Sequence, residues 1–149
     1  MQRRVTNGTS PAPPARLQLL NASPGRFCWL DLAARDAREA VRFYEGLFGW
    51  SASTQAANGG VFQRFVHRGE DVGSLYQLSA ALVARDAPSH WLPYVAVDDL
   101  DAAAQRAGPL GGAVLVAPFE VSNVARIALI ADAVGAHVGL WAPHGKRAG

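Results

Sequence analysis

The sequence is poor in cysteine and lacks long apolar runs. Cys28 is the only cysteine among 149 residues, so the chain can form neither an internal disulfide nor a zinc site built from several cysteines. No apolar run approaches the ~20 residues that span a bilayer, and the beginning of the chain lacks the apolar segment of a secretory signal. These absences predict a soluble, cytoplasmic protein with no membrane contact.

The chain also lacks any concentration of positive charge. Its net charge is +2, and Lys146 is the only lysine among 14 Lys and Arg residues. The arginines are scattered singly, and the tight basic pairs, Arg3-Arg4 and Lys146-Arg147, lie in the terminal segments. Because binding to nucleic acid requires a basic stripe or patch, we expect no nucleic acid partner.

What the chain does have is enough apolar material for one domain. Half of its residues are hydrophobic (50%), and its length is typical of a single domain. Residues 1–25 are rich in proline and predict a flexible leader, although the LQLL stretch within it could dock on the domain or on a partner subunit. We therefore expect a domain over residues 26–143 and a tail over residues 144–149.

The first half of this domain predicts the order strand, helix and three strands. In the segment 26–34, side chains alternate, so that Trp29 and Asp31 share one face of a strand. Asp36 and Glu39 form a capping box that begins a helix, and Gly49 ends it. Three further strands are predicted at residues 50–55, 60–68 and 72–79.

The second half repeats this order. A shift of 63 positions lays Asp36 on Asp99, the N-cap of a second helix, and a shift of 62 lays Gly73 on Gly135. Such self-similarity predicts an internal duplication of a βαβββ unit. The modules would span residues 26–80 and 90–143, joined by a linker over 80–89; the strands of the second are predicted at residues 90–97, 113–121, 124–131 and 136–141.

Several stretches resemble the glyoxalase, bleomycin-resistance and extradiol-dioxygenase superfamily, also called vicinal oxygen chelate proteins. They are residues 26–50, with the characteristic FYEGLFGW, and residues 90–112 and 130–143. The resemblance implies an α+β fold in which two βαβββ modules form curved sheets around a small-molecule cup. It also favours a homodimer, and it leaves open whether modules pair within one chain or across the dimer.

The same resemblance bears on metal binding. Metal-dependent members of the superfamily hold a divalent ion with His, Gln or Glu from the first and last strands of the modules. The corresponding positions here are Trp29, Leu92 and Gly139, with Gln77 at the fourth position under the 62-residue shift. A lone carboxamide cannot hold a divalent ion. The resemblance therefore implies a branch that lacks the usual metal ligands, and we expect no metal and no cofactor.

Strand alternation selects the residues that would face the cup. They are mainly aromatic, with a few polar groups, which is typical of a pocket for an organic ligand. The predicted ligand-binding residues are Trp29, Asp31, Gln77, Tyr94, His137 and Trp141.

Several of these side chains have alternative interpretations. Asp31 is either paired structurally, for instance with Arg126, or serves as a general base or polar anchor for the ligand. His137 is either a hydrogen-bonded wall residue or a catalytic group oriented by Asp31. The tryptophans Trp29 and Trp141 either fill the core or line the pocket.

The predicted function is metal-independent binding of a small, partly aromatic organic molecule, in the manner of drug-sequestering proteins. The alternative is a metal-free acid-base enzyme (an isomerase, lyase or hydroxylase-like activity) acting on a secondary metabolite, with Asp31 and His137 as catalytic candidates. A metal-dependent glyoxalase or dioxygenase ranks below it, and an interaction module without a ligand is a further class. The enzyme requires contact between Asp31 and His137 in an open cavity, the binder requires only the cavity, and the interaction module requires neither.

Overall fold

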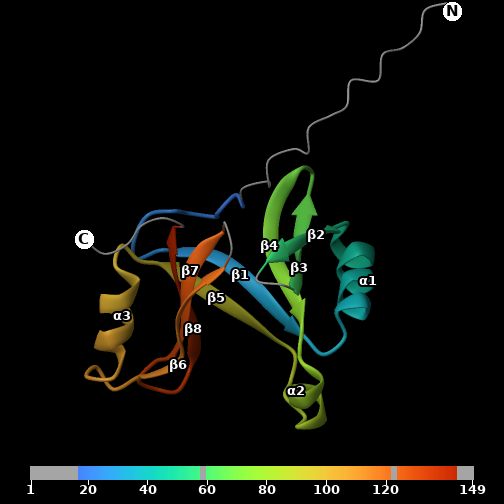
Figure 1. The fold of residues 1–149 in the computed structure, drawn as a ribbon. Coiled ribbons are helices and arrows are strands. Elements are labelled where there is room, and N and C mark those ends of the chain that lie inside the picture. The colour runs from blue at the N-terminus through green and yellow to red at the C-terminus, as the bar shows by residue number, and fades with distance from the viewer. Residues whose placement is uncertain (1–16, 58–59, 122–123, 144–149) are drawn as a thin grey trace, which may run out of the picture.

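A computed structural model of the chain describes residues 17–57, 60–121 and 124–143. The described elements follow the predicted order twice, strand then helix then three strands, which confirms the α+β class (Figure 1). Residues 1–16 of the predicted leader and the predicted tail, residues 144–149, lie outside the described residues. The elements are β1 (Phe27–Ala34), α1 (Ala37–Phe48), β2 (Ser51–Ala57), β3 (Gly60–His67), β4 (Glu70–Gln77), α2 (Ala80–Ala84), β5 (His90–Ala96), α3 (Leu100–Ala107), β6 (Ala113–Val121), β7 (Ala125–Ala131) and β8 (His137–Pro143).

The described strands form one eight-stranded sheet in the order β2-β3-β4-β1-β5-β8-β7-β6. Within each module the first strand pairs in parallel with the last, β1 with β4 and β5 with β8. The antiparallel pairing of β1 with β5 joins the modules, so the two modules of one chain pair with each other. The short helix α2, which the sequence analysis did not predict, lies in the linker between them and begins at the N-cap Ser79.

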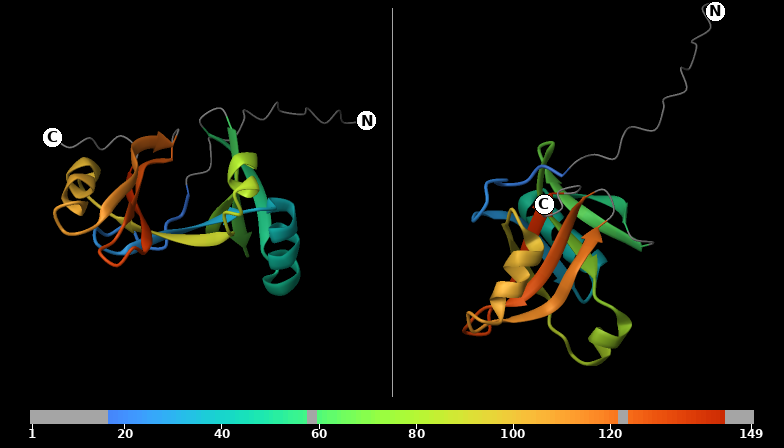
Figure 2. Two further views of the ribbon diagram at one scale, coloured as in Figure 1. Left: turned by 90° about the horizontal axis from the view of Figure 1, so that it is seen from below. Right: turned by 60° about the vertical axis from the view of Figure 1, so that its left-hand side comes forward.

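The sheet is curved into an open trough. Seen from below, β1 and β5 form its base, while β3 and β4 rise on one side and β6 and β7 on the other (Figure 2, left). The helices α1 and α3 lie on the outer faces at opposite ends. This arrangement leaves the concave face of the sheet uncovered by helices.

The caps of both long helices form as predicted. The Asp36 carboxylate accepts a hydrogen bond from the Glu39 backbone N–H at 3.1 Å, and Gly49 ends α1 with φ of 74°. The Asp99 carboxylate accepts likewise from the Ala102 N–H at 3.0 Å. Oxygen acceptors at these positions satisfy backbone donors that have no partner within the first helical turn.

Each helix covers a small outer core. The inner stripe of α1 packs on buried Leu32, Phe65 and Leu75, and α3 contributes buried Leu100 to a cluster with Ala128 and Leu140. Ala37, Ala40, Val41 and Tyr44 of α1 pack on the core. Leu47, near the end of the helix, is 58% exposed.

The inner core lies on the concave side and includes Trp29, Tyr94 and Trp141. Leu17 and Leu19 pack against this cluster, and the Leu20 N–H donates to the Cys28 carbonyl at 2.9 Å. The packed part of the chain therefore starts before residue 26, where the domain was predicted to begin, because these leucines bury apolar surface on the sheet.

Candidate functional site

A cavity of about 340 Å³ opens on the concave side of the sheet. Phe62 of β3 and Phe119 of β6 both line it, although their strands lie near opposite ends of the sheet order, because the sheet curves around it. Its volume falls within the usual range for small-molecule sites. The described lining residues are Leu17, Trp29, Asp31, Phe62, Ser74, Tyr76, Tyr94, Phe119, Val121, Val124, Ile127, Leu129 and Trp141.

Aromatic rings form one wall of the cavity. The Trp29 and Trp141 rings lie 6.1 Å apart between centroids at a tilt of 40°, and the Tyr94 ring meets Trp141 edge to face at 5.7 Å. These three side chains are almost fully buried and belong to the inner core. They therefore fill the core and line the pocket at the same time, which joins the two interpretations that the sequence left open.

A short chain of hydrogen bonds crosses the base of the cavity. The Trp29 indole N–H donates to the Ser74 hydroxyl oxygen at 2.8 Å, and the Ser74 hydroxyl donates to Asp31 Oδ1 at 2.8 Å. The Tyr94 hydroxyl also interacts with the Asp31 carboxylate and lowers its pKa. A serine hydroxyl has one proton to donate, so the Trp29 and Asp31 contacts together fix its orientation.

Burial dominates the electrostatics of Asp31. Desolvation raises the pKa of its carboxyl from 3.8 to about 6, against the opposing effects of the Ser74 hydrogen bond, the charge of His90 and the Tyr94 hydrogen bond. Desolvation and the nearby Asp31 charge raise the pKa of Tyr94 far above its ordinary value, so this hydroxyl stays protonated. Burial likewise raises the pKa of the Cys28 thiol to about 11, which keeps the thiol neutral.

Gly139 makes room for the Tyr94 ring. The two residues are directly paired between β5 and β8, and a Cβ atom built on Gly139 would collide with ring atoms of Tyr94. Glycine at position 139 thus permits the ring to lie against the neighbouring strand. The ring occupies the space where a longer side chain at position 139 would project.

The expectation that Gln77 of β4 faces the cup is wrong. Ser74 and Tyr76 line the cavity, whereas Leu75 packs under α1. The error arises from the turns: β3 and β4 are joined across Arg68 and Gly69, whereas β7 and β8 are joined by the longer segment 132–136. The 62-residue shift ignored this difference, and a one-residue error reverses the faces of a strand.

Correct pairing also changes the comparison of the modules. Ser74 pairs with Asp31 in the first module, and Gly139 pairs with Tyr94 in the second, so Ser74 and not Gln77 corresponds to Gly139.

With this correction, the four positions that the resemblance assigns to metal ligands hold Trp29, Ser74, Leu92 and Gly139. This set offers a single hydroxyl oxygen, already engaged by Trp29 and Asp31, and therefore does not fit a divalent ion. Within the described ranges, no group of three or more His, Cys, Asp or Glu side chains is placed to hold a metal.

The structure brings four of the six predicted site residues together: Trp29, Asp31, Tyr94 and Trp141 all line the cavity. Gln77 lies elsewhere, since its amide accepts from the Ala37 N–H at 2.9 Å and donates to the Arg35 carbonyl at the start of α1.

His137 also lies outside the lining. It is exposed at the start of β8, where it pairs with Ala131. Strand alternation gave it the same parity as Trp141 but could not show that the cavity ends before it.

The suggested pairing of Asp31 with Arg126 is wrong. The Arg126 guanidinium instead binds Asp101 of α3 through two hydrogen bonds of 3.1 and 3.2 Å. Alternation places Arg126 between Ala125 and Ile127, whose side chains belong to the inner core, so the arginine points to the helix side of β7.

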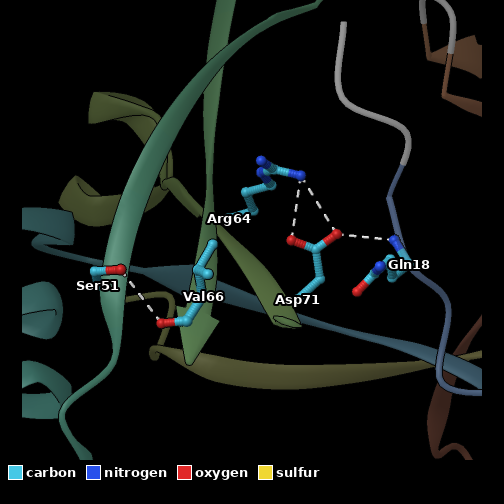
Figure 3. Close-up of polar contacts among 5 residues, drawn as sticks. All are labelled: Gln18, Ser51, Arg64, Val66 and Asp71. Atoms are coloured by element: carbon cyan, nitrogen blue, oxygen red, sulfur yellow. Dashed lines mark hydrogen bonds and ion pairs between the residues drawn. The ribbon is translucent and has the colours of Figure 1, made fainter. Parts of the chain in front are cut away.

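A second ion pair lies near the cavity. Arg64 is paired with Ser74 in the sheet, but its guanidinium turns to Asp71, with contacts of 3.2 and 3.3 Å to the two carboxylate oxygens (Figure 3). The Asp71 carboxylate also accepts from the Gln18 backbone N–H at 2.8 Å. This pair neutralises the arginine charge and ties the N-terminal segment to β4.

Sequence reasoning missed Ser74, Tyr76, Phe62 and Phe119 as lining residues. The signal for Ser74 and Tyr76 was available in the short turn before β4, which fixes the strand register. Phe62 and Phe119 lie on strands whose approach depends on the curvature of the whole sheet, and no local pattern encodes it.

A sequence model of the Glyoxalase/Bleomycin resistance protein/Dioxygenase superfamily matches residues 26–139. The chain belongs to this superfamily. Among solved structures, a variant of Streptomyces coelicolor methylmalonyl-CoA epimerase in complex with 2-nitronate-propionyl-CoA superposes with a TM-score of 0.60. That match has 18% identity and covers 85% of this chain and all of the epimerase chain, so it supports the superfamily fold alone.

Two curated relatives are closer in sequence. The "Putative glyoxylase CFP32" of Mycobacterium bovis is 33% identical over 130 residues, which cover 86% of this chain and 48% of that protein. The anthracycline biosynthesis protein DnrV of Streptomyces peucetius is 32% identical over 130 residues, which cover 80% of this chain and 47% of that protein. The chain thus spans about half the length of these relatives.

Among the described residues, no helix is both long and apolar enough to cross a membrane.

Proposed function

We propose that the protein binds a small, partly aromatic organic molecule in the cavity, without a metal ion. The observation that carries this proposal is the open cavity of about 340 Å³, with aromatic walls and a carboxylate at its base. Aromatic rings such as those of Trp29 and Trp141 offer flat apolar surface for stacking, and Asp31 offers a polar anchor. The similarity to a protein named for anthracycline biosynthesis supports a secondary metabolite as the class of ligand.

An acid-base enzyme on the same scaffold is the second candidate. It is favoured by the raised pKa of Asp31, about 6, because a general acid or base works best when its pKa lies near the working pH. His137 lies outside the cavity lining, so Asp31 would act with Ser74 and Tyr94 instead. The absence of the contact between Asp31 and His137 favours the binder over the enzyme, and the open cavity speaks against a pure interaction module.

A thermal-shift screen against aromatic metabolites and antibiotics tests the proposal. A ligand that binds only the native state raises the Tm. Trp141→Phe removes part of the aromatic surface that lines the cavity and should therefore lower the affinity of such a ligand. Trp91→Phe is the matched control, since Trp91 hydrogen-bonds Tyr44 outside the cavity lining. Binding that Trp91→Phe weakens as much as Trp141→Phe, or no binding at all, would contradict the proposal.

The same ligands separate binder from enzyme. A binder releases each ligand unchanged, as shown after long incubation by mass spectrometry coupled to a chromatographic step that separates isomers. An enzyme converts at least one of them, and Asp31→Asn then abolishes conversion while leaving binding measurable.

We further propose that the protein is a homodimer in the cytoplasm. Apolar side chains on α1 and on the edge strand β6 support an association surface: Phe43 is 60% exposed and Val114 is 44% exposed. Sedimentation analysis should show a dimer that Phe43→Glu or Val114→Glu converts to monomer. A wild-type monomer at high concentration would contradict this part of the proposal.

A further inference from the structure

Two hydrogen-bond donors at the base of the cavity, the Trp29 indole and the Ser74 hydroxyl, are already engaged. The Trp29 N–H is used by Ser74, and the hydroxyls of Ser74 and Tyr94 are used by Asp31. A carboxylate has about four acceptor sites, and these two hydroxyls fill at most two of them. The polar base of the cavity therefore presents unused acceptor capacity to a ligand.

The charge at this base is also uncompensated. Asp31 is the only Asp, Glu, Lys, Arg or His among the described lining residues. The nearby guanidinium of Arg64 is paired with Asp71, and Arg126 is paired with Asp101 on the outer side. His90, which influences Asp31 through its charge, is exposed and contacts the Pro88 carbonyl at 3.0 Å. An ionised Asp31 thus lacks a basic partner within the lining.

We propose that the cavity selects organic cations, that is, molecules in which a protonated amine or quaternary ammonium group adjoins an aromatic or apolar body. This inference rests on the proposed binding function and names its ligand class. A cation would meet the Asp31 carboxylate at the base of the cavity. Its apolar body would then lie against the tryptophan rings.

Two physical effects favour this class. A buried carboxylate is costly unless it is paired, so a ligand cation relieves a cost that a neutral ligand leaves in place. Trp29, Tyr94 and Trp141 line the same space, and aromatic rings attract ammonium groups. An anionic ligand would meet repulsion from Asp31 and no cationic group among the lining residues that the structure describes.

Three probes of similar size and different charge test the proposal: 2-phenylethylammonium, 2-phenylethanol and phenylacetate. Titration calorimetry of the full chain at pH 7.5 gives their affinities. We expect the ammonium probe to bind at least ~10-fold more tightly than the alcohol, and phenylacetate to bind more weakly than either.

Asp31→Asn should remove the preference for the ammonium probe, so that the ratio of its affinity to that of the alcohol falls to about one. Asp101→Asn is the matched control, because it removes the same charge from an exposed ion pair outside the cavity lining. This control should keep the full preference. A loss of preference in both variants would indicate an effect of net charge and would overturn the inference.

A pH titration of the unmodified protein gives a test that does not depend on a variant folding. Benzyltrimethylammonium keeps its charge at every pH, so its affinity should fall as Asp31 is protonated below about pH 6. His90 is the other ionisable group whose charge acts on Asp31, and a positive charge there would also oppose the binding of a cation. Tyr76, Tyr94 and Cys28 have raised pKa values and remain neutral, while Arg64 and Asp71 remain paired.

The outcomes separate this inference from the proposed function. Equal affinity for the ammonium probe and the alcohol, or tighter binding of phenylacetate, would overturn the choice of cations while the binding function stands. A benzyltrimethylammonium affinity that is constant from about pH 5 to pH 8 would overturn it equally. Failure of every probe, whatever its charge, to bind would contradict both proposals.

Discussion

The two modules share one topology but treat corresponding positions differently. In the first module, Asp31 pairs with Ser74 and the two side chains hydrogen-bond each other at 2.8 Å. In the second, Tyr94 pairs with Gly139, and the tyrosine ring covers the glycine. Thus at these paired positions the first module places a charged group and the second places a bulky aromatic ring.

This difference shows how a duplicated fold can build an asymmetric site. Strand pairing fixes where the backbones lie, so each pair of positions holds a limited volume of side chain. The first module fills that volume with two short polar groups, whereas the second fills it with one ring. The arrangement can be tested position by position, starting from the second module, where the packing is tightest.

Gly139→Ala should have the largest effect. Its Cβ atom would collide with the Tyr94 ring, which is held between β8 and Trp141. We expect a loss of about 3 kcal/mol in the free energy of unfolding, measured by urea denaturation. In a Tyr94→Ala background the same change should be nearly neutral, because the colliding ring is gone. Gly46→Ala, with nothing near the added Cβ, is the matched control and should not destabilise. Additive effects of the changes at positions 139 and 94 would refute this account.

Ser74→Ala should come next. It leaves the Trp29 indole N–H and the Asp31 carboxylate without their shared partner, at a cost of about 2 kcal/mol in unfolding free energy. The pKa of Asp31 should also rise, since the Ser74 hydrogen bond lowers it. As a control, Ser51→Ala removes an exposed hydrogen bond of 3.3 Å to the Val66 carbonyl and should change stability little (Figure 3). Equal losses in unfolding free energy for the two serine variants would show that the hydrogen-bond chain adds no stability beyond that of an exposed hydrogen bond.

Asp31→Asn should have a smaller effect, a pH-dependent gain in the free energy of unfolding. The folded Asp31 carboxyl has a pKa of about 6, whereas the ordinary pKa of an aspartate is 3.8, so between these pH values the folded state binds more protons than the unfolded state. The stability that this extra proton contributes is present at low pH and is lost as pH rises through about 6. Asparagine cannot ionise, so we expect this decline to disappear and the variant to be about 1 kcal/mol more stable than wild type at pH 7.5. Parallel curves of stability against pH for the two proteins would contradict the raised pKa.

Leu47→Ala should have the smallest effect on folding. Leu47 is 58% exposed at the end of α1, whereas α3 of the second module buries Leu100. At a protein concentration low enough to prevent association, the unfolding free energy should change by less than about 0.5 kcal/mol. A loss above about 1 kcal/mol would mean that α1 is packed more tightly than its exposure indicates.

The predictable part of the fold came from local patterns. The capping groups of Asp36 and Asp99, the stop at Gly49 and the alternation within the first strand each depend on neighbours in the chain. They were therefore correct in the sequence analysis. The repeat of these signals was also enough to predict two modules, since each module uses the same local chemistry.

The candidate site was predictable only in part. Trp29, Asp31, Tyr94 and Trp141 were found because alternation within a strand is fixed once one residue is placed. Gln77 was assigned to the wrong face because its position depended on counting residues across turns of unequal length. His137 was assigned to the cavity because alternation gives a direction but not the extent of a cavity.

The sequence by itself determined the class of fold, the order of its elements and the aromatic character of the concave face. These properties follow from short-range periodicity and from caps, which act within a few residues. The tertiary structure decided the partner of each polar group: Asp31 meets Ser74 and Tyr94, while Arg126 meets Asp101. Such contacts join residues far apart in the chain, so they depend on strand register and sheet curvature, which no single segment encodes.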